Sequence, residues 1–412
     1  MLGNLSGVCG VVQCVTIMTK PLALVVVLLA LVGASPASGK GGDLYALRYG
    51  AKMNVLVPYD PVRVVPAGPS IRLGQFAHAW SMSPDRSRFV AAAGSRSNGE
   101  STALRFVDLA SGRIEGTLSL PGELRRVTAT AWFRGRVLAV VSGSDSTTVY
   151  SVDPDKRVVV SQVEFPGIVV LGERTPSSVV LLLTTPGVIG PATVAVVDQS
   201  PRVRTVLLDR ITAGMTVTGT GSERRTTVRR PGLALAPSGL RAFVFGADEP
   251  TAVIDLRTLA VRYPPVRMIA AVQKQAQGSV RTAATLPDGR IVVSGYELGV
   301  AGSTTLQLVN PKDWSSRALA PATSWFRVGG GMVFTHGARG TGLRILKPSG
   351  VAIELFPGRS VGNVFVVGPR AFVTFFGTKQ NAAVIMLGTG RVIRHTVPAH
   401  PLIGAGQPIF VG

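Results

Sequence analysis

The chain has 412 residues, of which 46% are hydrophobic, 16% charged and 6% aromatic. This apolar content is enough for a large core, and it excludes an intrinsically disordered chain. The net charge of +21 could attract nucleic acid, anionic lipid or an acidic wall polymer. The basic residues are scattered and no aromatic rings interleave with them, so we expect solvated surface charge and no specific nucleic-acid binding. An anionic polymer remains the alternative partner.

The amino-terminal segment has the pattern of a secretory signal peptide. Lys20 precedes an apolar run from Leu22 to Val32, which has the length of a signal sequence and is short for a membrane span. The small residues Ser35-Pro36-Ala37 follow. We therefore predict a signal peptide over residues 1–37. An uncleaved anchor is the alternative.

Residues 1–17 are uncharged and fit poorly as the start of a signal peptide, so Met18 is the alternative start. Cleavage would remove Cys9 and Cys14 and leave no disulfide or thiolate metal site. No second apolar run of spanning length follows. We expect a short linker over residues 38–43, then a secreted or cell-envelope domain over 44–412 without a membrane span.

A repeated unit fills the chain after the linker. Its pattern is a strand, a Pro-containing turn, a strand, a variable loop, a strand ending in an acidic residue, a second turn and a fourth strand. In the first turn, Pro presets φ, Asp or Ser bonds back to the backbone, and Gly takes positive φ. This turn is Pro84-Asp85 in one unit, Pro237-Ser238-Gly239 in another and Pro287-Asp288-Gly289 in a third.

The second turn carries a short Asx side chain at a fixed place. The recurrence itself explains these residues as turn formers and not as catalytic acids. They are Asp108, Asp153, Asp198, Asp255 and Asn310.

The repeat predicts an all-β fold, a β-propeller of four-stranded blades. Runs such as Val-Val-Leu-Leu-Leu are apolar on successive residues, which is typical of strands buried on both faces between neighbouring blades. Residues 44–73 supply three further strands, and Gln407 to Val411 a single one. Together they would form a closing blade that removes open sheet edges. This count favours eight blades. Seven is the alternative.

The turn motifs resemble those of the YVTN, TolB-like and WD-repeat propeller superfamily, and the composition resembles secreted actinobacterial members. The motifs are Ser83-Pro84-Asp85, Leu286-Pro287-Asp288-Gly289 and Val107-Asp108-Leu109-Ala110-Ser111-Gly112. The resemblance covers residues 44–412 and implies a central channel with broad loop faces. It implies no activity, because such folds serve as scaffolds, surface proteins and enzymes.

No catalytic motif is recognisable in the chain. The four histidines, His78, His336, His395 and His400, have no metal-binding spacing. We therefore predict no cofactor and lean against an enzyme. The alternative is a metal-dependent lyase or hydrolase at the channel mouth. A divalent metal would then require His78, His336 and a nearby acid to converge.

Aromatic and basic residues on the first strands are the candidate binding groups. Three tryptophans occupy comparable places on three first strands, where they either pack between blades or form an aromatic wall in the channel. Arginine follows two of them in a Trp-Phe-Arg sequence and suits a carboxylate or phosphate. The candidates are Trp80, Trp132, Arg134, Trp325 and Arg327, with His78 on the same strand as Trp80.

A long basic loop is predicted over residues 212–231, with Arg224, Arg225, Arg229 and Arg230 as the tightest cationic group. The absence of a catalytic set favours a binding or interaction module. Its partner would be an unidentified protein or cell-envelope ligand. We expect a monomer.

Overall fold

The fold was analysed in a computed structural model. All residues it describes belong to one compact unit, residues 41–412. The described ranges are 44–48, 54–60, 66–74, 79–94, 103–121, 126–220, 224–246, 250–266, 268, 278–297, 304–323, 325–336, 340–347, 349–375, 382–394 and 402–403. The predicted signal peptide (1–37), the linker (38–43) and the strand at 407–411 lie outside them.

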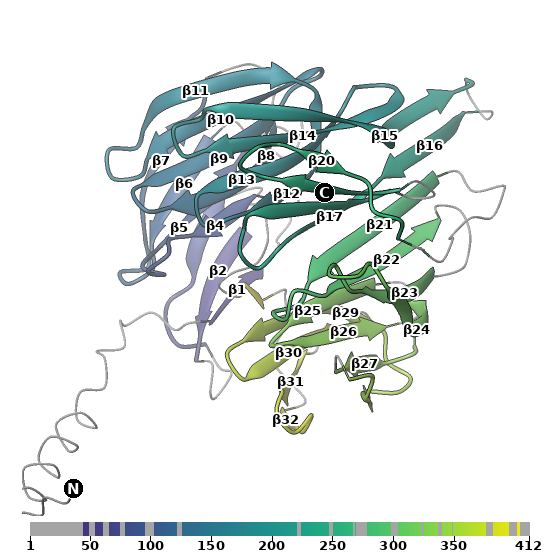
Figure 1. Ribbon diagram of the computed structural model, residues 1–412. Coiled ribbons are helices and arrows are strands. Elements are labelled where there is room, and N and C mark those ends of the chain that lie inside the picture. The colour runs from purple at the N-terminus through teal and green to yellow at the C-terminus, as the bar shows by residue number, and fades with distance from the viewer. Residues whose placement is uncertain are drawn as a thin grey trace, which may run out of the picture. The chain divides into compact units, whose positions relative to one another are not determined.

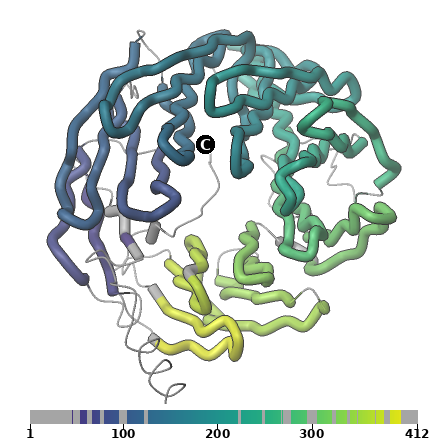
Figure 2. Tube along the Cα trace, turned by 60° about the vertical axis from the view of Figure 1, so that its left-hand side comes forward, coloured from purple at the N-terminus to yellow at the C-terminus, as the bar shows by residue number. Residues whose placement is uncertain are grey.

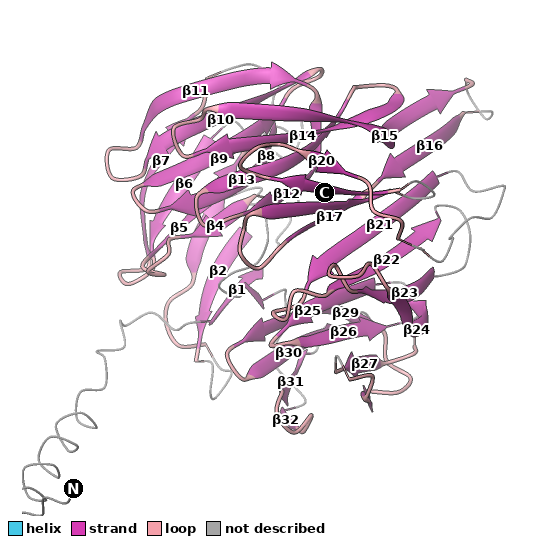
Figure 3. Cartoon of the chain, in the orientation of Figure 1, coloured by secondary structure: helices cyan, strands magenta, loops and turns pink. Residues whose placement is uncertain are grey.

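Strands and turns make up all of the described chain, as Figure 3 shows. In these ranges no helix has the length and apolarity needed to cross a membrane. The all-β prediction is confirmed.

Most strands form small antiparallel meanders (Figure 1). Within the described residues there are six sheets of four strands. They are β3-β2-β1-β33 (β1 Leu44–Arg48, β2 Asn54–Tyr59, β3 Ile71–Gly74, β33 Leu402–Ile403), β4 to β7 (Trp80–Met82, Arg88–Ala93, Ala103–Asp108, Arg113–Ser119), β8 to β11 (Arg126–Phe133, Arg136–Ser142, Ser146–Asp153, Val158–Pro166), β17 to β20 (Gly232–Leu235, Arg241–Phe245, Thr251–Asp255, Val261–Arg262), β25 to β28 (Trp325–Gly329, Met332–His336, Leu343–Leu346, Ala352–Leu355) and β29 to β32 (Val361–Val367, Arg370–Phe375, Ala382–Met386, Val392–Arg394).

The seventh sheet in the described chain has nine strands. It consists of two further meanders joined by β16. The first meander is β12 to β15 (Ile168–Arg174, Ser178–Thr184, Ile189–Asp198, Val203–Thr218), the bridging strand is β16 (Arg225–Arg230), and the second meander is β21 to β24 (Gly278–Thr285, Ile291–Glu297, Thr304–Val309, Ser316–Thr323).

The first strands of successive meanders contact one another in chain order, from β4 through β8, β12, β17, β21 and β25 to β29. In Figure 2 the meanders follow one another round a ring. This arrangement of four-stranded meanders is a β-propeller. We call each meander a blade. The term channel is used for the space that the first strands surround.

The core lies between neighbouring blades, and each blade contributes both of its faces. Phe89 packs with the blade that contains β1 to β3, whereas the next residue, Val90, packs with β8 to β10. Similarly, Val179 and Val180 on β13 belong to different interblade clusters. Successive apolar residues are therefore all buried, which confirms the interpretation of the apolar runs.

The first turn of the repeat has the predicted chemistry. The Asp85 carboxylate accepts a hydrogen bond from the Ser87 amide at 3.1 Å, and Asp288 accepts one from Arg290 at 3.0 Å. Gly239 and Gly289 both have positive φ, of 68° and 88°. Each donates its amide to the residue three positions earlier, so Gly is needed there for its left-handed backbone.

The predicted turn role of the recurring Asx residues is also confirmed. Asp153 accepts hydrogen bonds from two amides at 3.0 Å, and so does Asp255 at 2.9 and 3.0 Å. Asp108, Asp198 and Asn310 accept equivalent bonds from amides two to four residues ahead. These side chains hold the turn between the third and fourth strands and are committed to the fold.

Replacing Arg86 by Gly is expected to stabilise the protein by about 1 kcal/mol, because Arg86 occupies the position that Gly239 and Gly289 fill in other blades. Its φ of 60° is left-handed. Chemical unfolding of Arg86→Gly and of the reverse change, Gly289→Arg, should shift the free energy of unfolding in opposite directions. Equal stability of Arg86→Gly and the native chain would contradict this.

The predicted basic loop over residues 212–231 is wrong, because this segment is a β-hairpin. Strand β15 continues to Thr218 and pairs with β16, with Met215 opposite Val228 and Val217 opposite Thr226. Thr and Val alternate on both sides of a Gly-containing turn, and such β-branched alternation favours strands over a loop.

The hairpin carries the four predicted arginines to two different places. Arg224 and Arg225 are exposed near its tip. Arg229 and Arg230 lie where β16 runs parallel to β21, and the Arg229 guanidinium donates to the Ser279 hydroxyl at 3.0 Å. They do not form a single basic loop.

The two ends of the domain meet in one sheet. Strand β33 pairs antiparallel with β1, with Leu402 opposite Ala46 and Ile403 opposite Tyr45. Tyr45 is buried.

Candidate functional site

Two charged side chains of opposite sign come from first strands on different parts of the ring. Glu173 lies on β12 and Arg327 on β25. In the order in which the first strands contact one another, β17 and β21 come between β12 and β25. The two side chains nevertheless interact electrostatically. We call Glu173 and Arg327 the channel pair.

Glu173 and Arg327 are half-buried, and partial burial shifts the pKa of both groups. Desolvation raises the pKa of Glu173 from 4.5 to about 8, and the positive charge of Arg327 only partly opposes this shift. Desolvation likewise lowers the pKa of Arg327 to about 10, with partial opposition from Glu173. Low polarity disfavours the charged form of each group. The raised pKa favours the protonated form of the Glu173 carboxyl near neutral pH, whereas Arg327 stays a cation.

Trp325 and His336 form the support of Arg327. The rings of Trp325 and His336 stack with centroids 5.2 Å apart, because the two residues are paired across β25 and β26. The Arg327 guanidinium carbon lies 5.6 Å from the Trp325 ring centre. A cation beside an aromatic face is stabilised by the ring's charge distribution. The aromatic pair thus fixes the position of the cation.

A second cation stands next to Glu173 in the sequence. The Arg174 guanidinium carbon lies 4.7 Å from the Phe133 ring centre on the neighbouring blade, and burial lowers the pKa of Arg174. Residues Glu173 and Arg174 point to opposite faces of β12, as successive strand residues do. Arg174 therefore contacts β8.

The three predicted tryptophans do not occupy equivalent places. Trp80 and Trp325 each pair with a residue eleven positions later, Ala91 and His336, at the beginning of their strands. Trp132 pairs with Val137, five positions later, next to the turn. The common Trp-Phe-Arg sequence had indicated equivalence, and this part of the prediction is wrong, because the turn follows at a different distance in the two units.

Each tryptophan has its own packing partner. Trp80 stacks on Phe89 at 5.9 Å. Trp132 is buried and meets the edge of Phe106 at 6.2 Å. These two rings belong to interblade clusters, in agreement with the packing interpretation.

Arg134 and Arg327 occupy different positions in their respective hairpins. It is exposed in the turn between β8 and β9, whereas Arg327 lies inside β25 opposite Phe334. Arg134 lines a pocket of about 390 Å³ together with Trp132, Arg88 and Asp155. The predicted pair of guanidinium groups on one face is not formed.

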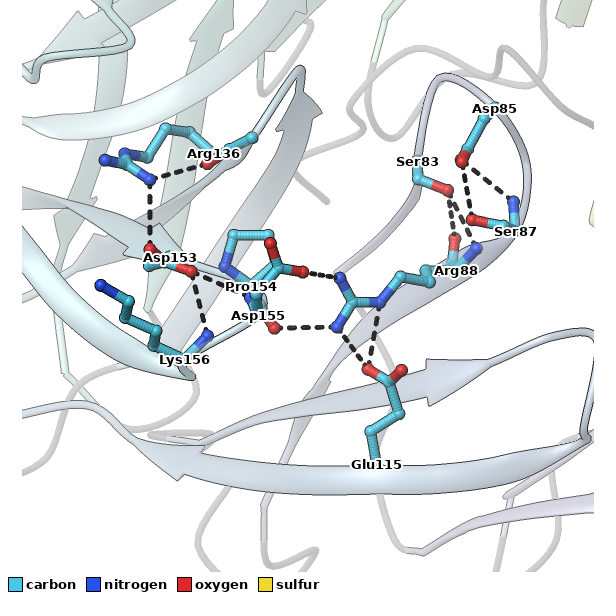
Figure 4. Close-up of polar contacts among 11 residues, drawn as sticks. Ser83, Asp85, Ser87, Arg88, Glu115, Arg136, Asp153, Pro154, Asp155 and Lys156 are labelled. Atoms are coloured by element: carbon cyan, nitrogen blue, oxygen red, sulfur yellow. Dashed lines mark hydrogen bonds and ion pairs between the residues drawn. The ribbon is translucent and has the colours of Figure 1, made fainter.

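Arg88 dominates that pocket and is bound on all sides (Figure 4). Its guanidinium donates to the Glu115 carboxylate at 2.6 and 3.1 Å, to Asp155 at 2.5 Å and to the Pro154 carbonyl at 2.9 Å. The guanidinium carbon of Arg88 also lies 5.6 Å from the Trp132 ring centre. Asp155 and Trp132 belong to the next blade, so this Arg88 clasp joins two blades and has a structural role.

The metal-site alternative gains no support from the described residues. No group of three His, Cys, Asp or Glu side chains able to hold a metal is found among them. His78, His395 and His400 lie outside the described ranges. The predicted convergence of His78 and His336 with an acid stays a prediction.

Comparisons with known proteins identify the fold. No family model and no curated protein matches the sequence. Among solved structures, the chain is similar to "Dihydro-heme d1 dehydrogenase NirN in complex with DHE", with 11% identity, a TM-score of 0.62 and coverage of 88% of this chain and 75% of that one.

Two structures of AztD from Citrobacter koseri are also similar. The apo form shows 12% identity and a TM-score of 0.51, covering 89% of this chain and 96% of that one. The other structure shows 13% identity and a TM-score of 0.53, covering 89% of this chain and 95% of that one. Identities this low carry over the fold and nothing more. The chain therefore has a β-propeller fold, in agreement with the fold that its turn motifs predicted.

Proposed function

We propose that this protein is a binding module that holds an anionic ligand group in its channel. The channel pair carries the proposal, because it combines a guanidinium supported by Trp325 and His336 with a half-buried carboxyl group on another first strand. Guanidinium groups bind the planar oxygens of carboxylates and the oxygens of phosphates well. The ligand would carry one of these groups and be small enough to enter the channel.

Protonation of Glu173 would control binding. Below pH 8 the neutral carboxyl can donate a hydrogen bond, and the channel carries the net positive charge of Arg327. Above pH 8 the Glu173 carboxylate would repel an anion and compete for Arg327. We therefore expect affinity for an anion to fall as pH rises through 8.

Calorimetric titration with galacturonate and with inorganic phosphate, on either side of pH 8, tests this function. The first probe represents a carboxylate source and the second a phosphate source. One of them should bind saturably at the lower pH, and about tenfold more weakly at the higher one. Arg327→Gln should abolish binding, and Glu173→Gln should retain binding at both pH values.

Arg134→Gln is the matched control, since Arg134 is exposed on a turn. Equal binding by Arg327→Gln and the native chain would contradict the proposal, as would affinity independent of pH. Turnover of a substrate by the purified protein would replace a binding role with an enzymatic one.

We further propose that the protein works outside the cytoplasm, secreted or held at the cell envelope. The support is the apolar run Leu22 to Val32 between Lys20 and Ala37. Amino-terminal sequencing of the exported protein should find a start just after Ala37. A protein that keeps residues 1–37 and stays in the cytoplasm would contradict export.

We also propose that the ring has eight blades, the last of them closed by β33 against β1. The pairing of Tyr45 with Ile403 supports closure, as does the division of the nine-stranded sheet into two meanders. Deletion of residues 401–412 should lower the melting temperature by several degrees, since it would leave β1 an open edge. Deletion of residues 1–37 is the control and should not. An unchanged melting temperature in the first variant would contradict closure.

A further inference from the structure

We propose that a second site binds an extended acidic peptide. It is a groove of about 870 Å³ between the blade of β17 to β20 and the blade of β21 to β24. The turns and strand ends of both blades line it. This interblade groove is distinct from the channel, and the inference is independent of the proposed channel ligand.

The floor of the interblade groove is aromatic and apolar. Trp314 and Phe243 meet edge to face, with ring centres 6.2 Å apart. Tyr263 also lines the groove; its hydroxyl donates to Asp209 at 2.6 Å, and the Arg210 guanidinium carbon lies 5.0 Å from its ring centre. Leu240 is 46% exposed in the same groove. Flat aromatic surfaces of this kind bind extended chains, especially those containing proline.

Trp314 occupies a position where the fold accepts glycine. It has a left-handed φ of 60° and donates its amide to the carbonyl of Asn310, four residues earlier. In other blades the same bond and a left-handed φ are found at Gly390, Leu259 and Arg157, whose φ values are 68°, 61° and 55°. A bulky side chain is strained in this conformation. The turn alone does not require tryptophan, and the Trp314 ring packs against the interblade cluster that contains Phe243, where it forms part of the groove floor.

The charged side chains that line the groove are all positive. Arg241, Arg262 and Lys312 line it, and no carboxylate side chain does. Across the described residues, none of these three cations lies within ion-pair distance of a carboxylate. All three are exposed. An acidic partner complements this arrangement, and a basic one is repelled.

The composition of the lining suits a peptide, and the volume is large enough for a short one. The volume lies near the upper end of small-molecule sites, which span roughly 300–1,000 Å³. The groove contains Pro237, Pro264, Pro265 and Pro311, which keep its walls apolar and present no backbone donors. Recognition would rest on packing against Trp314, with carboxylates held by the three cations.

Fluorescence anisotropy of a labelled hexapeptide of alternating Glu and Pro, added to the full chain, tests this site. We expect saturable binding that weakens as salt is added, because exposed charges are screened. Trp314→Gly should weaken it about tenfold, as expected for a central aromatic anchor. This variant should fold, since Gly390 occupies the equivalent position, and its melting temperature verifies that.

Charge reversal on the protein and on the peptide tests separately where the peptide binds and whether it must be acidic. Lys312→Glu and Arg262→Glu should each weaken binding, whereas Lys156→Glu, an exposed change in the corresponding turn of another blade, should not. Full binding by folded Trp314→Gly would overturn the site. Equal binding of a peptide with Lys in place of Glu would overturn the acidic ligand class. Failure of the native chain to bind the Glu-Pro peptide would overturn the proposal.

Discussion

Replacing Glu173 by Gln should make the protein progressively more stable than the native chain as pH rises from 4.5 to 8. The folded chain holds the Glu173 proton up to about pH 8, whereas the unfolded chain releases it near 4.5. Between these values unfolding releases a proton, so native stability falls with a slope of about 1.4 kcal/mol per pH unit. The contribution of the neutral carboxyl is complete below pH 4.5 and lost above 8.

Urea unfolding of both proteins at three pH values across this window measures the effect. The difference in free energy of unfolding isolates Glu173, because other titrating groups are common to both chains. The turn carboxylates Asp85, Asp153 and Asp288 have lowered pKa values, owing chiefly to hydrogen bonds. Their stabilising effect is lost only at more acidic pH. A difference that stays constant across the window would contradict burial of Glu173.

Replacing Arg88 by Ala should destabilise the protein by about 2–3 kcal/mol. The change would remove the ion pairs to Glu115 and Asp155 and leave the Glu115 carboxylate, whose side chain is only 22% exposed, without its cation. It would also remove the guanidinium that packs beside Trp132. The expected result is a lower midpoint of denaturant unfolding.

Arg88→Lys is the matched variant for the geometry of the clasp. Lysine keeps the charge but cannot reach two carboxylates and the Pro154 carbonyl in one plane, so it should recover only part of the loss. Arg134→Ala, in the same pocket but exposed, should change stability by less than about 0.5 kcal/mol. Equal effects of the changes at Arg88 and Arg134 would contradict the clasp.

The repeat was predictable from the sequence because local chemistry specifies it. Pro287-Asp288-Gly289 and Asp255 hold their turns through hydrogen bonds that span only two to five residues. Apolar residues on successive positions, as in β13, likewise follow from burial on both faces. The fold class therefore needed no information from distant parts of the chain.

The site was not predictable, because it depends on register and on the curvature of the ring. Glu173 lies between Gly172 and Arg174 at the end of β12, and no local pattern connects it with Arg327, more than one hundred residues later. The two Trp-Phe-Arg sequences look equivalent, yet Trp132 and Trp325 lie at opposite ends of their hairpins. Only the assembled ring brings the charge of Arg327 near enough to shift the pKa of Glu173.

The most direct test of the channel pair is the titration of the Glu173 carboxyl by carbon NMR, assigned with Glu173→Gln. The structure predicts a midpoint near pH 8, which should move upward in Arg327→Gln, because the positive charge of Arg327 opposes the effect of burial. A midpoint near the ordinary value of 4.5, unchanged by the loss of Arg327, would contradict the channel pair and with it the proposed proton-controlled binding site.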